Sequence, residues 1–466
     1  MHRNPDGRCC RGLRVCLTLC CAVCGVVACR SIARSADRYD LGLTPQARPT
    51  FAVTSEIKLA GKFYTHPDAP KTSQWTMTST ANYRYRERRL PGSGRRAAAF
   101  RSLRIYDQAE SRTQVGQRTT SLQLHPQLKV VVASGQADGV ELFSARHLFR
   151  RDDLDLLNVP GDSLAIQTLL PRTQVAVGDT WQATSWSLQM LCDLDTLFNG
   201  QITCELKSVK QGLARIDLHG TAEGATAGAK AKLTLDGYCL FDLQLQSLRE
   251  LHLTQTEQRT PGTVSPGMNI TANVVCKWSP APTVPALTDA AAAAIPLRPP
   301  LSMQQLSCVI PESIRFRHTR NWHVYHQSRD TTILRLLDRG RLVAQCDITR
   351  LPAAQPGQHL PQSRFVADIR ESLGNQLERI GQGQSTAPNS SLFRFRIVAE
   401  GQNSGQKFRW IYYLCADRSG RQTALMFRVA ESEHERFAGQ DQQIAASLEF
   451  LPRAPRPAAT PTRPAR

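Results

Sequence analysis

The sequence lacks several features that would define its class at once. After residue 28 no apolar run approaches the ~20 residues of a membrane-spanning helix, which excludes a membrane protein with several helical spans. It also contains no G-x-S-x-G elbow, no H-E-x-x-H zinc helix, no P-loop and no G-x-G-x-x-G after a strand pattern. Acidic residues are scarce, with 39 Asp and Glu against 58 Lys and Arg, a net charge of +19. With 41% hydrophobic residues the 466-residue chain is ordinary globular material, long enough for about two or three domains.

The first 33 residues predict an export signal peptide. Several arginines precede an apolar stretch, Val15–Ala28, whose length is typical of a signal-peptide core. Two cleavage sites fit and both stay open. The run Val26-Val27-Ala28-Cys29 is similar to a bacterial lipobox, in which Cys29 would carry the lipid, whereas Ser31-Ile32-Ala33 suits ordinary signal peptidase. An uncleaved anchor is a third alternative. We therefore expect an exported protein that is periplasmic, envelope-anchored or secreted, associated with the membrane only through its signal or a lipid anchor.

The cysteines outside the signal are widely spaced. Seven follow the signal, and none has the close spacing of a zinc site. They are Cys192, Cys204, Cys239, Cys276, Cys308, Cys346 and Cys415. Their apolar surroundings predict buried free thiols. A disulfide within residues 192–276 remains an alternative in an oxidising compartment.

Composition divides the rest of the chain. Residues 51–278 are rich in strand patterns, and residues 279–305 form a Pro- and Ala-rich stretch that predicts a semi-extended linker with little to pack. Residues 306–451 predict a second compact domain. The Pro-, Ala- and Arg-rich residues 452–466 predict a disordered tail.

Residues 51–278 have the alternation of antiparallel strands. Aromatic or apolar side chains recur at alternate positions between Trp75 and Tyr85, and similar strand patterns follow up to Trp278. The acidic stretch Asp152–Leu157 predicts a short helix with carboxylates at its start. Two runs of strands around this helical break predict one long curved sheet, similar to a half-barrel, or two related halves.

The second domain mixes helix and strand. Apolar residues recur at three- and four-residue steps from Phe365 to Ile380 and predict one helix. A second helix is predicted from Glu431 to Leu448, after two strands joined by a turn at Gly420. The whole chain is thus predicted to be α+β, with an N-terminal curved antiparallel sheet and a C-terminal antiparallel sheet flanked by helices.

The second domain contains a series of characteristic segments, which are Ile310-Pro311-Glu312, Trp322-His323-Val324, Trp410–Leu414, Gly420, Ala424–Val429, Arg436-Phe437, Asp441 and Ser447–Phe450. With these segments, residues 308–451 resemble the PsbP-like superfamily, which includes extrinsic photosystem II subunits and many exported bacterial proteins. The resemblance implies an antiparallel sheet flanked by helices, and it carries over no catalytic residues because the family has none in common. Residues 51–278 more loosely resemble the half-barrel of LolA-like lipoprotein carriers.

Three groups of residues come close to a metal site. His323 and His326 are three apart, but a strand would place the two rings on opposite faces. The acidic groups beginning at Asp152 and at Asp193 lack the residues that complete a calcium loop. We therefore predict no metal, no cofactor and no catalytic residue. Asn269 and Asn389 begin glycosylation sequons, which matter only in a eukaryotic secretory pathway.

The most unusual surface feature is basic. In Tyr83-Arg84-Tyr85-Arg86 the two residue types alternate, so a strand would place the arginines on one face and the tyrosines on the other. This face is either a solvated surface or a binding site for an anionic partner such as lipid headgroups or acidic polysaccharide. We expect no nucleic-acid partner, because export removes the chain from most nucleic acid. The residues proposed for the anionic surface are Arg84, Arg86, Arg88, Arg89, Arg95 and Arg96.

These observations predict an exported, non-catalytic binding or scaffold protein of the cell envelope. It would carry an apolar or anionic ligand, with an envelope protein as a second kind of partner. One alternative is a secreted hydrolase whose site is assembled from dispersed residues. The other is a purely structural interaction protein.

Overall fold

The computed structural model describes residues 37–42, 50–64, 74–90, 97–136, 139–296, 299–311, 313–385 and 392–452. The predicted signal peptide with Cys29, residues Arg95 and Arg96, nearly all of the predicted tail and the Asn389 sequon lie outside these residues. From Arg38 onward the chain belongs to one unit of contacts. No helix within the described ranges is long and apolar enough to cross a bilayer.

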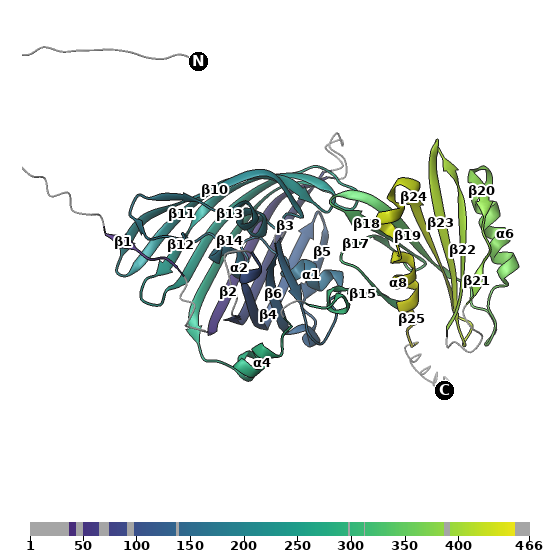
Figure 1. The fold of residues 1–466 in the computed structure, drawn as a ribbon, viewed down its shortest axis with the longest axis horizontal. Coiled ribbons are helices and arrows are strands. Elements are labelled where there is room, and N and C mark those ends of the chain that lie inside the picture. Colours follow the sequence, from purple (N-terminus) through teal and green to yellow (C-terminus); the bar gives the residue numbers. More distant parts are fainter. Residues whose placement is uncertain are drawn as a thin grey trace, which may run out of the picture. The chain divides into compact units, whose positions relative to one another are not determined.

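The first region is one large antiparallel sheet of twelve strands (Figure 1). Its path runs β7-β6-β4-β3-β2-β14-β13-β12-β11-β10-β9, with β5 paired to β4. The earliest strand of the sheet, β2, pairs along its whole length with the last, β14, so the two runs of strands join into one sheet. The strands are β2 (Thr50–Tyr64), β3 (Gln74–Arg89), β4 (Arg101–Val115), β5 (Arg118–Gln123), β6 (Val130–Gln136), β7 (Gly139–Phe143), β9 (Thr180–Gln182), β10 (Thr196–Lys210), β11 (Leu213–Thr226), β12 (Ala229–Asp242), β13 (Ser247–Arg259) and β14 (Gly267–Ala281).

The sheet curves around three short helices, α1 (Arg151–Leu157), α2 (Ser163–Gln167) and α3 (Ser185–Cys192) (Figure 1). Their apolar side chains and those of one sheet face form a single core, which includes Leu164 and Ile166 of α2. Tyr83 of β3 belongs to this core and donates a hydrogen bond to the Leu156 carbonyl at 2.8 Å. The helices therefore mark the concave face. Successive side chains of a strand alternate between this face and the convex one, so side chains two positions apart share a face. A two-stranded pairing of β1 (Arg38–Tyr39) with β8 (Val175–Ala176) lies apart from the large sheet in the strand order.

Residues 282–296 and 299–305, here called the connecting segment, differ from the predicted linker. They contain α4 (Asp289–Ala293), α5 (Leu301–Gln304) and a short 3-10 turn at Pro285–Leu287. Leu287 is completely buried in a second small core with Leu90, Leu103 and Phe143. The expectation of little packing was wrong, because the apolar side chains among its prolines and alanines cover the convex end of β4 and β6.

The second region contains an eight-stranded antiparallel sheet with path β17-β18-β19-β24-β23-β22-β20, in which β21 pairs with β22. Helix α8 (Gln440–Ser447) and helix α6 (Gln362–Leu373) pack on opposite faces (Figure 1). A separate sheet joins β15, β16 and β25. The strands are β15 (Leu306–Ile310), β16 (Ile314–His318), β17 (Trp322–Gln327), β18 (Thr331–Asp338), β19 (Arg341–Leu351), β20 (Leu377–Ile380), β21 (Gln384–Ser385), β22 (Leu392–Asn403), β23 (Gln406–Asp417), β24 (Gln422–Ala430) and β25 (Glu449–Phe450).

Both helices predicted in this region are shorter than the sequence pattern suggests. Helix α6 ends at Leu373, because Gly374 takes a φ of 47°, and the residues Leu377–Ile380 form a strand instead. The predicted helix Glu431–Leu448 is divided into α7 (His434–Phe437) and α8 by Gly439, with a φ of 76°. A backbone with positive φ cannot continue a right-handed helix. The chain is mostly antiparallel β-sheet, so the α+β class holds only approximately.

Candidate ligand-binding sites

The predicted basic strand lies on β3, and its two residue types face opposite ways. Tyr83 and Tyr85 are buried in the concave core, while Arg84 is exposed on the convex face. Arg84 Nε donates to Gln108 Oε1 at 2.7 Å, and Arg86 lies 3.5 Å from the Asp107 carboxylate. Both arginines are accessible there.

Arg88 and Arg89 lie at the end of the same strand and differ in burial. Arg88 is buried, donates to the Leu287 carbonyl at 2.5 Å and pairs with Asp289 of the connecting segment. Arg89 stands over the Phe51 ring at 5.2 Å, and burial lowers its pKa. Arg88 therefore holds the connecting segment to β3, whereas Arg89 is partly accessible.

A band of apolar side chains lies on the concave face beyond the three helices. In one row of the sheet Val115, Met77, Gly61 and Ile270 are direct cross-strand neighbours on β4, β3, β2 and β14. The next row contains Trp75, Phe63 and Met268, and the Trp75 and Phe63 rings lie 5.5 Å apart. We call this the concave band, which consists of Leu59, Phe63, Trp75, Met77, Val115, Met268 and Ile270.

The concave band continues the same face as the core but is not part of it. Ile57 and Ala81 are buried in the core, and Leu59 and Met77 follow on the same face at two- and four-residue steps. Each band residue stays partly accessible, and Trp75 is 38% exposed. None of the seven packs against the buried clusters formed by the described residues. Three strand spacings of about 4.8 Å make the longer row about 14 Å wide.

Polar groups border this band on β13. Glu257 is opposite Ile270 and forms an ion pair of 2.6 Å with Arg259. Gln255 is buried, and its Oε1 atom has no hydrogen-bond partner among the described residues. Asp193 lies at the end of α3, and its pKa is raised to about 7, mainly by burial and also by the negative charge of Asp195. The positive charge of Arg259 lowers this pKa in part. The oxygen atoms of these bordering residues can accept a hydrogen bond from a hydroxyl or amide group of a ligand whose apolar part lies on the concave band.

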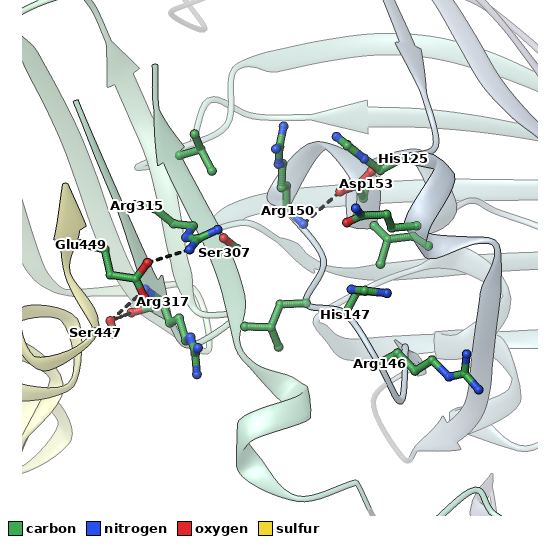
Figure 2. A pocket seen from close by; sticks show the side chains of 14 residues that line it. His125, Arg146, His147, Arg150, Asp153, Ser307, Arg315, Arg317, Ser447 and Glu449 are labelled. Atoms are coloured by element: carbon green, nitrogen blue, oxygen red, sulfur yellow. Dashed lines mark hydrogen bonds and ion pairs between the residues drawn. The ribbon is translucent and has the colours of Figure 1, made fainter. Parts of the chain in front are cut away.

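A second site is a polar cleft of about 330 Å³, shown in Figure 2. Arg146, His147 and Arg150 reach it from the segment between β7 and α1, and Arg315 and Arg317 from β16. We call this pocket the arginine cleft, after its four exposed arginines. His125 and Ser307 also line it.

The arginine cleft contains the residue types of a hydrolytic triad but not the contacts. The Ser447 hydroxyl donates to the Ile444 carbonyl at 3.0 Å and accepts from the Arg317 backbone N–H at 2.9 Å. Asp153 accepts the backbone N–H of Arg150 at 3.0 Å instead of a histidine ring. Within the described ranges no hydrogen bond joins a serine of the cleft to a histidine.

The residues that the sequence analysis compared with metal sites are ordinary parts of strands and helices. Asp153 lies in the first turn of α1, as the acidic stretch predicts. His323 on β17 is half-buried and burial lowers its pKa to about 3, whereas His326 is exposed. No group of three or more potential ligands forms a metal site in the described part of the chain.

The seven cysteines outside the signal are all buried and free in this structure, as their apolar surroundings predict. The alternative of a disulfide within residues 192–276 is therefore wrong for this conformation. Burial raises the pKa values of Cys204, Cys308 and Cys415 to about 12. Such thiols behave as small apolar side chains.

No family model and no curated protein matches the chain. Among solved structures, "Lipid-protein interactions in lipovitellin" is similar over 52% of this chain at 9% identity and a TM-score of 0.29, and the chain spans only 26% of that one. DynF from the dynemicin pathway of Micromonospora chersina is similar over 53% of this chain and 86% of its own, at 8% identity and a TM-score of 0.15. The translocator domain of the autotransporter NalP from Neisseria meningitidis covers 83% and 89%, at 6% identity and 0.13. Scores this low carry no argument.

The sequence analysis missed both sites. The alternation at Trp75 and Met77 signals a strand, but it does not say that this end of the strand extends beyond the helices. The arginine cleft joins Arg146 and Arg150 to Arg315 and Arg317, more than 160 positions away. No local spacing connects these residues.

Proposed function

We propose that the protein is a non-catalytic binding protein that carries a linear apolar ligand, such as an acyl chain, on the concave band. The observation that supports this most is the accessible row of Val115, Met77 and Ile270 on the face that elsewhere forms the core. Contiguous apolar surface left uncovered is typical of ligand or partner sites. A flat, narrow row across neighbouring strands suits an extended chain better than a bulky ring system.

A fluorescent fatty acid, 11-(dansylamino)undecanoic acid, tests this proposal. We expect saturable binding with a blue-shifted emission. The affinity of Met77→Glu should be at least tenfold weaker, because the bound acyl chain would remove water from the new carboxylate. Thr78→Glu is the matched control, since Thr78 is the next residue of β3 and lies exposed on the convex face. Ile270→Glu and Asn269→Glu repeat the comparison on β14.

Absence of saturable binding by the wild-type protein contradicts the proposal. Equal weakening by Met77→Glu and Thr78→Glu also contradicts it, because the effect would then not depend on the concave face. Far-ultraviolet circular dichroism of each variant checks that the sheet is retained. If Met77→Glu fails to fold, the β14 pair decides the question.

We further propose that the protein acts outside the cytoplasm, on the basis of the signal pattern in residues 1–33. Intact mass spectrometry of the protein from its own envelope tests this. A chain that starts at Cys29 with added acyl mass indicates a lipoprotein, and one that starts at Arg34 indicates a secreted or periplasmic protein. A chain that starts at Met1 and is found only in the cytoplasm contradicts export.

The second sheet is proposed to be a PsbP-like domain that serves as an adaptor for an envelope protein. Its support is the resemblance of residues 308–451 and an arrangement of one antiparallel sheet with α6 and α8 on opposite faces. Crosslinking in intact cells, followed by identification of the partner, tests the adaptor role. If only copies of the chain itself are recovered, this role is contradicted.

A further inference from the structure

We infer that the arginine cleft binds a phosphorylated ligand. This site is separate from the concave band, and the inference does not depend on the proposed carrier function. It rests on the charge of the cleft, on the side chains that remain available in it, and on its size.

The charge of the cleft is unbalanced. Four guanidinium groups line it, against the two carboxylates of Asp153 and Glu449. Asp153 is buried, and its two oxygens accept the backbone N–H groups of His125 and Arg150 at 3.2 and 3.0 Å. Glu449 pairs with Arg315 at 2.6 Å. Both carboxylates are thus already engaged.

Three arginines therefore remain available. No carboxylate among the described residues lies within ion-pair distance of the guanidinium groups of Arg146, Arg150 or Arg317. Elsewhere on the protein, exposed arginines such as Arg364 and Arg379 do have carboxylate partners. Exposed guanidinium groups that line a pocket without a carboxylate partner can pair with a bound anion.

The chemistry of these groups favours phosphate. A guanidinium presents a planar fork of N–H donors that matches two oxygens of a phosphate, and such charge-assisted bonds are stronger than neutral ones. Figure 2 shows that the arginines come from both sides of the cleft, Arg150 from the segment before α1 and Arg317 from β16. His147 and the Ser307 hydroxyl add further polar groups to the lining.

The size of the cleft limits the ligand. A volume of about 330 Å³ is at the lower end of the range for small-molecule sites, about 300–1,000 Å³, and exceeds what one inorganic anion fills. A phosphate monoester or a diphosphate group therefore fits best. The same chemistry is offered by a soluble phosphorylated molecule and by a phospholipid headgroup, and the experiment has an arm for each.

The first arm is isothermal titration of the full-length protein with inorganic pyrophosphate at low ionic strength. We expect one saturable site that weakens as salt is added. Arg150→Gln and Arg317→Gln should each weaken binding about tenfold or more, and Arg150→Lys should restore part of the loss, because it keeps the charge without the fork. Arg364→Gln is the matched control, since it removes the same charge from an exposed position of α6, outside the cleft.

The second arm is co-sedimentation with phosphatidylcholine vesicles that contain phosphatidic acid, whose headgroup is a phosphate monoester. Binding that is lost in Arg150→Gln and Arg317→Gln assigns the cleft to a headgroup, and pyrophosphate binding without vesicle binding assigns it to a soluble ligand. The inference is overturned if pyrophosphate and vesicles both fail to bind, or if Arg364→Gln weakens binding as much as the cleft variants do. All three side chains are exposed, so thermal unfolding should be unchanged. If one variant nevertheless unfolds, the other decides.

Discussion

Burial can change the role of an arginine from surface contact to structural support. Arg104 of β4, opposite Glu87 of β3, is an example. Its side chain is 1% exposed and contacts Glu87 at 2.9 Å and both oxygens of Asp162 at 2.7 Å. The Ser163 hydroxyl donates to Glu87 in the same network. Burial lowers the pKa of Arg104, but the charges of Asp162 and Glu87 outweigh burial and hold the pKa well above its ordinary value. The network ties the start of α2 to the concave face.

Replacing Arg104 should therefore be costly. Arg104→Met leaves two buried carboxylates without their cationic partner, and we expect the free energy of unfolding to fall by about 3–5 kcal/mol. Urea unfolding followed by tryptophan fluorescence measures this. Arg84→Gln, on the exposed face, should change it by less than about 0.5 kcal/mol. A loss below about 1 kcal/mol for Arg104→Met would show that the carboxylates find other partners.

His318 predicts a loss of stability in acid. It is 2% exposed, with Nδ1 2.8 Å from the Thr319 carbonyl, and burial lowers its pKa from 6.5 to about 4. The unfolded chain takes up the proton first as pH falls. The contribution is therefore present above pH 6.5 and is lost between pH 6.5 and about 4, at most about 3 kcal/mol.

Denaturant unfolding of the wild type and of His318→Gln at several pH values between 7 and 4 tests this. The difference in stability between the two proteins should shrink or reverse over that interval, because glutamine does not titrate. If the two pH profiles are parallel, His318 is not the group responsible. Comparing the two proteins removes the contribution of the carboxylates, which titrate in both.

At the scale of elements, the connecting segment shows how composition can mislead. Its prolines and alanines predict a linker, yet Leu287 is buried, and the Pro296 carbonyl accepts a hydrogen bond from Arg101 at 2.8 Å. Composition records how many apolar groups a segment has. It does not record whether a neighbouring surface, such as the convex end of β4 and β6, is available to receive them.

Leu287→Asp should release the connecting segment. A carboxylate at this position loses its hydration among the apolar side chains of the small core, so local opening should become much more frequent. Limited proteolysis should then cleave residues 282–305 at least tenfold faster, as measured by mass spectrometry of the fragments. Ala290→Asp, at an exposed position of α4, is the control and should leave the rate unchanged. Equal rates for both variants would show that Leu287 does not anchor the segment.

At the scale of the whole molecule, the seven free cysteines outside the predicted signal lie in both large sheets, in the small sheet of β15 and in helix α3, and every one is buried. An exported chain meets an oxidising compartment, where accessible thiols form disulfides. Burial therefore protects these thiols only as long as both cores remain folded. Their reactivity reports on the integrity of the entire molecule.

Iodoacetamide labelling at pH 8 tests this protection. We expect none of the seven cysteines at positions 192–415 to react within an hour in the native protein, and all seven to react in guanidinium chloride. Intact mass spectrometry counts the labels. Rapid labelling of one cysteine in the native protein would show that its core opens locally, and peptide mapping would identify which one.

The sequence by itself determined the features that depend on near neighbours along the chain. The alternation of Tyr83, Arg84, Tyr85 and Arg86 predicted a strand with two unlike faces, and the acidic start of α1 predicted a short helix, because pleating and capping act over a few residues. Only the tertiary structure decided that β2 pairs with β14, that Arg88 is buried under the connecting segment, and that Arg150 and Arg317 share a cleft. These facts depend on strand register and packing between segments far apart in the chain, where local patterns carry no information.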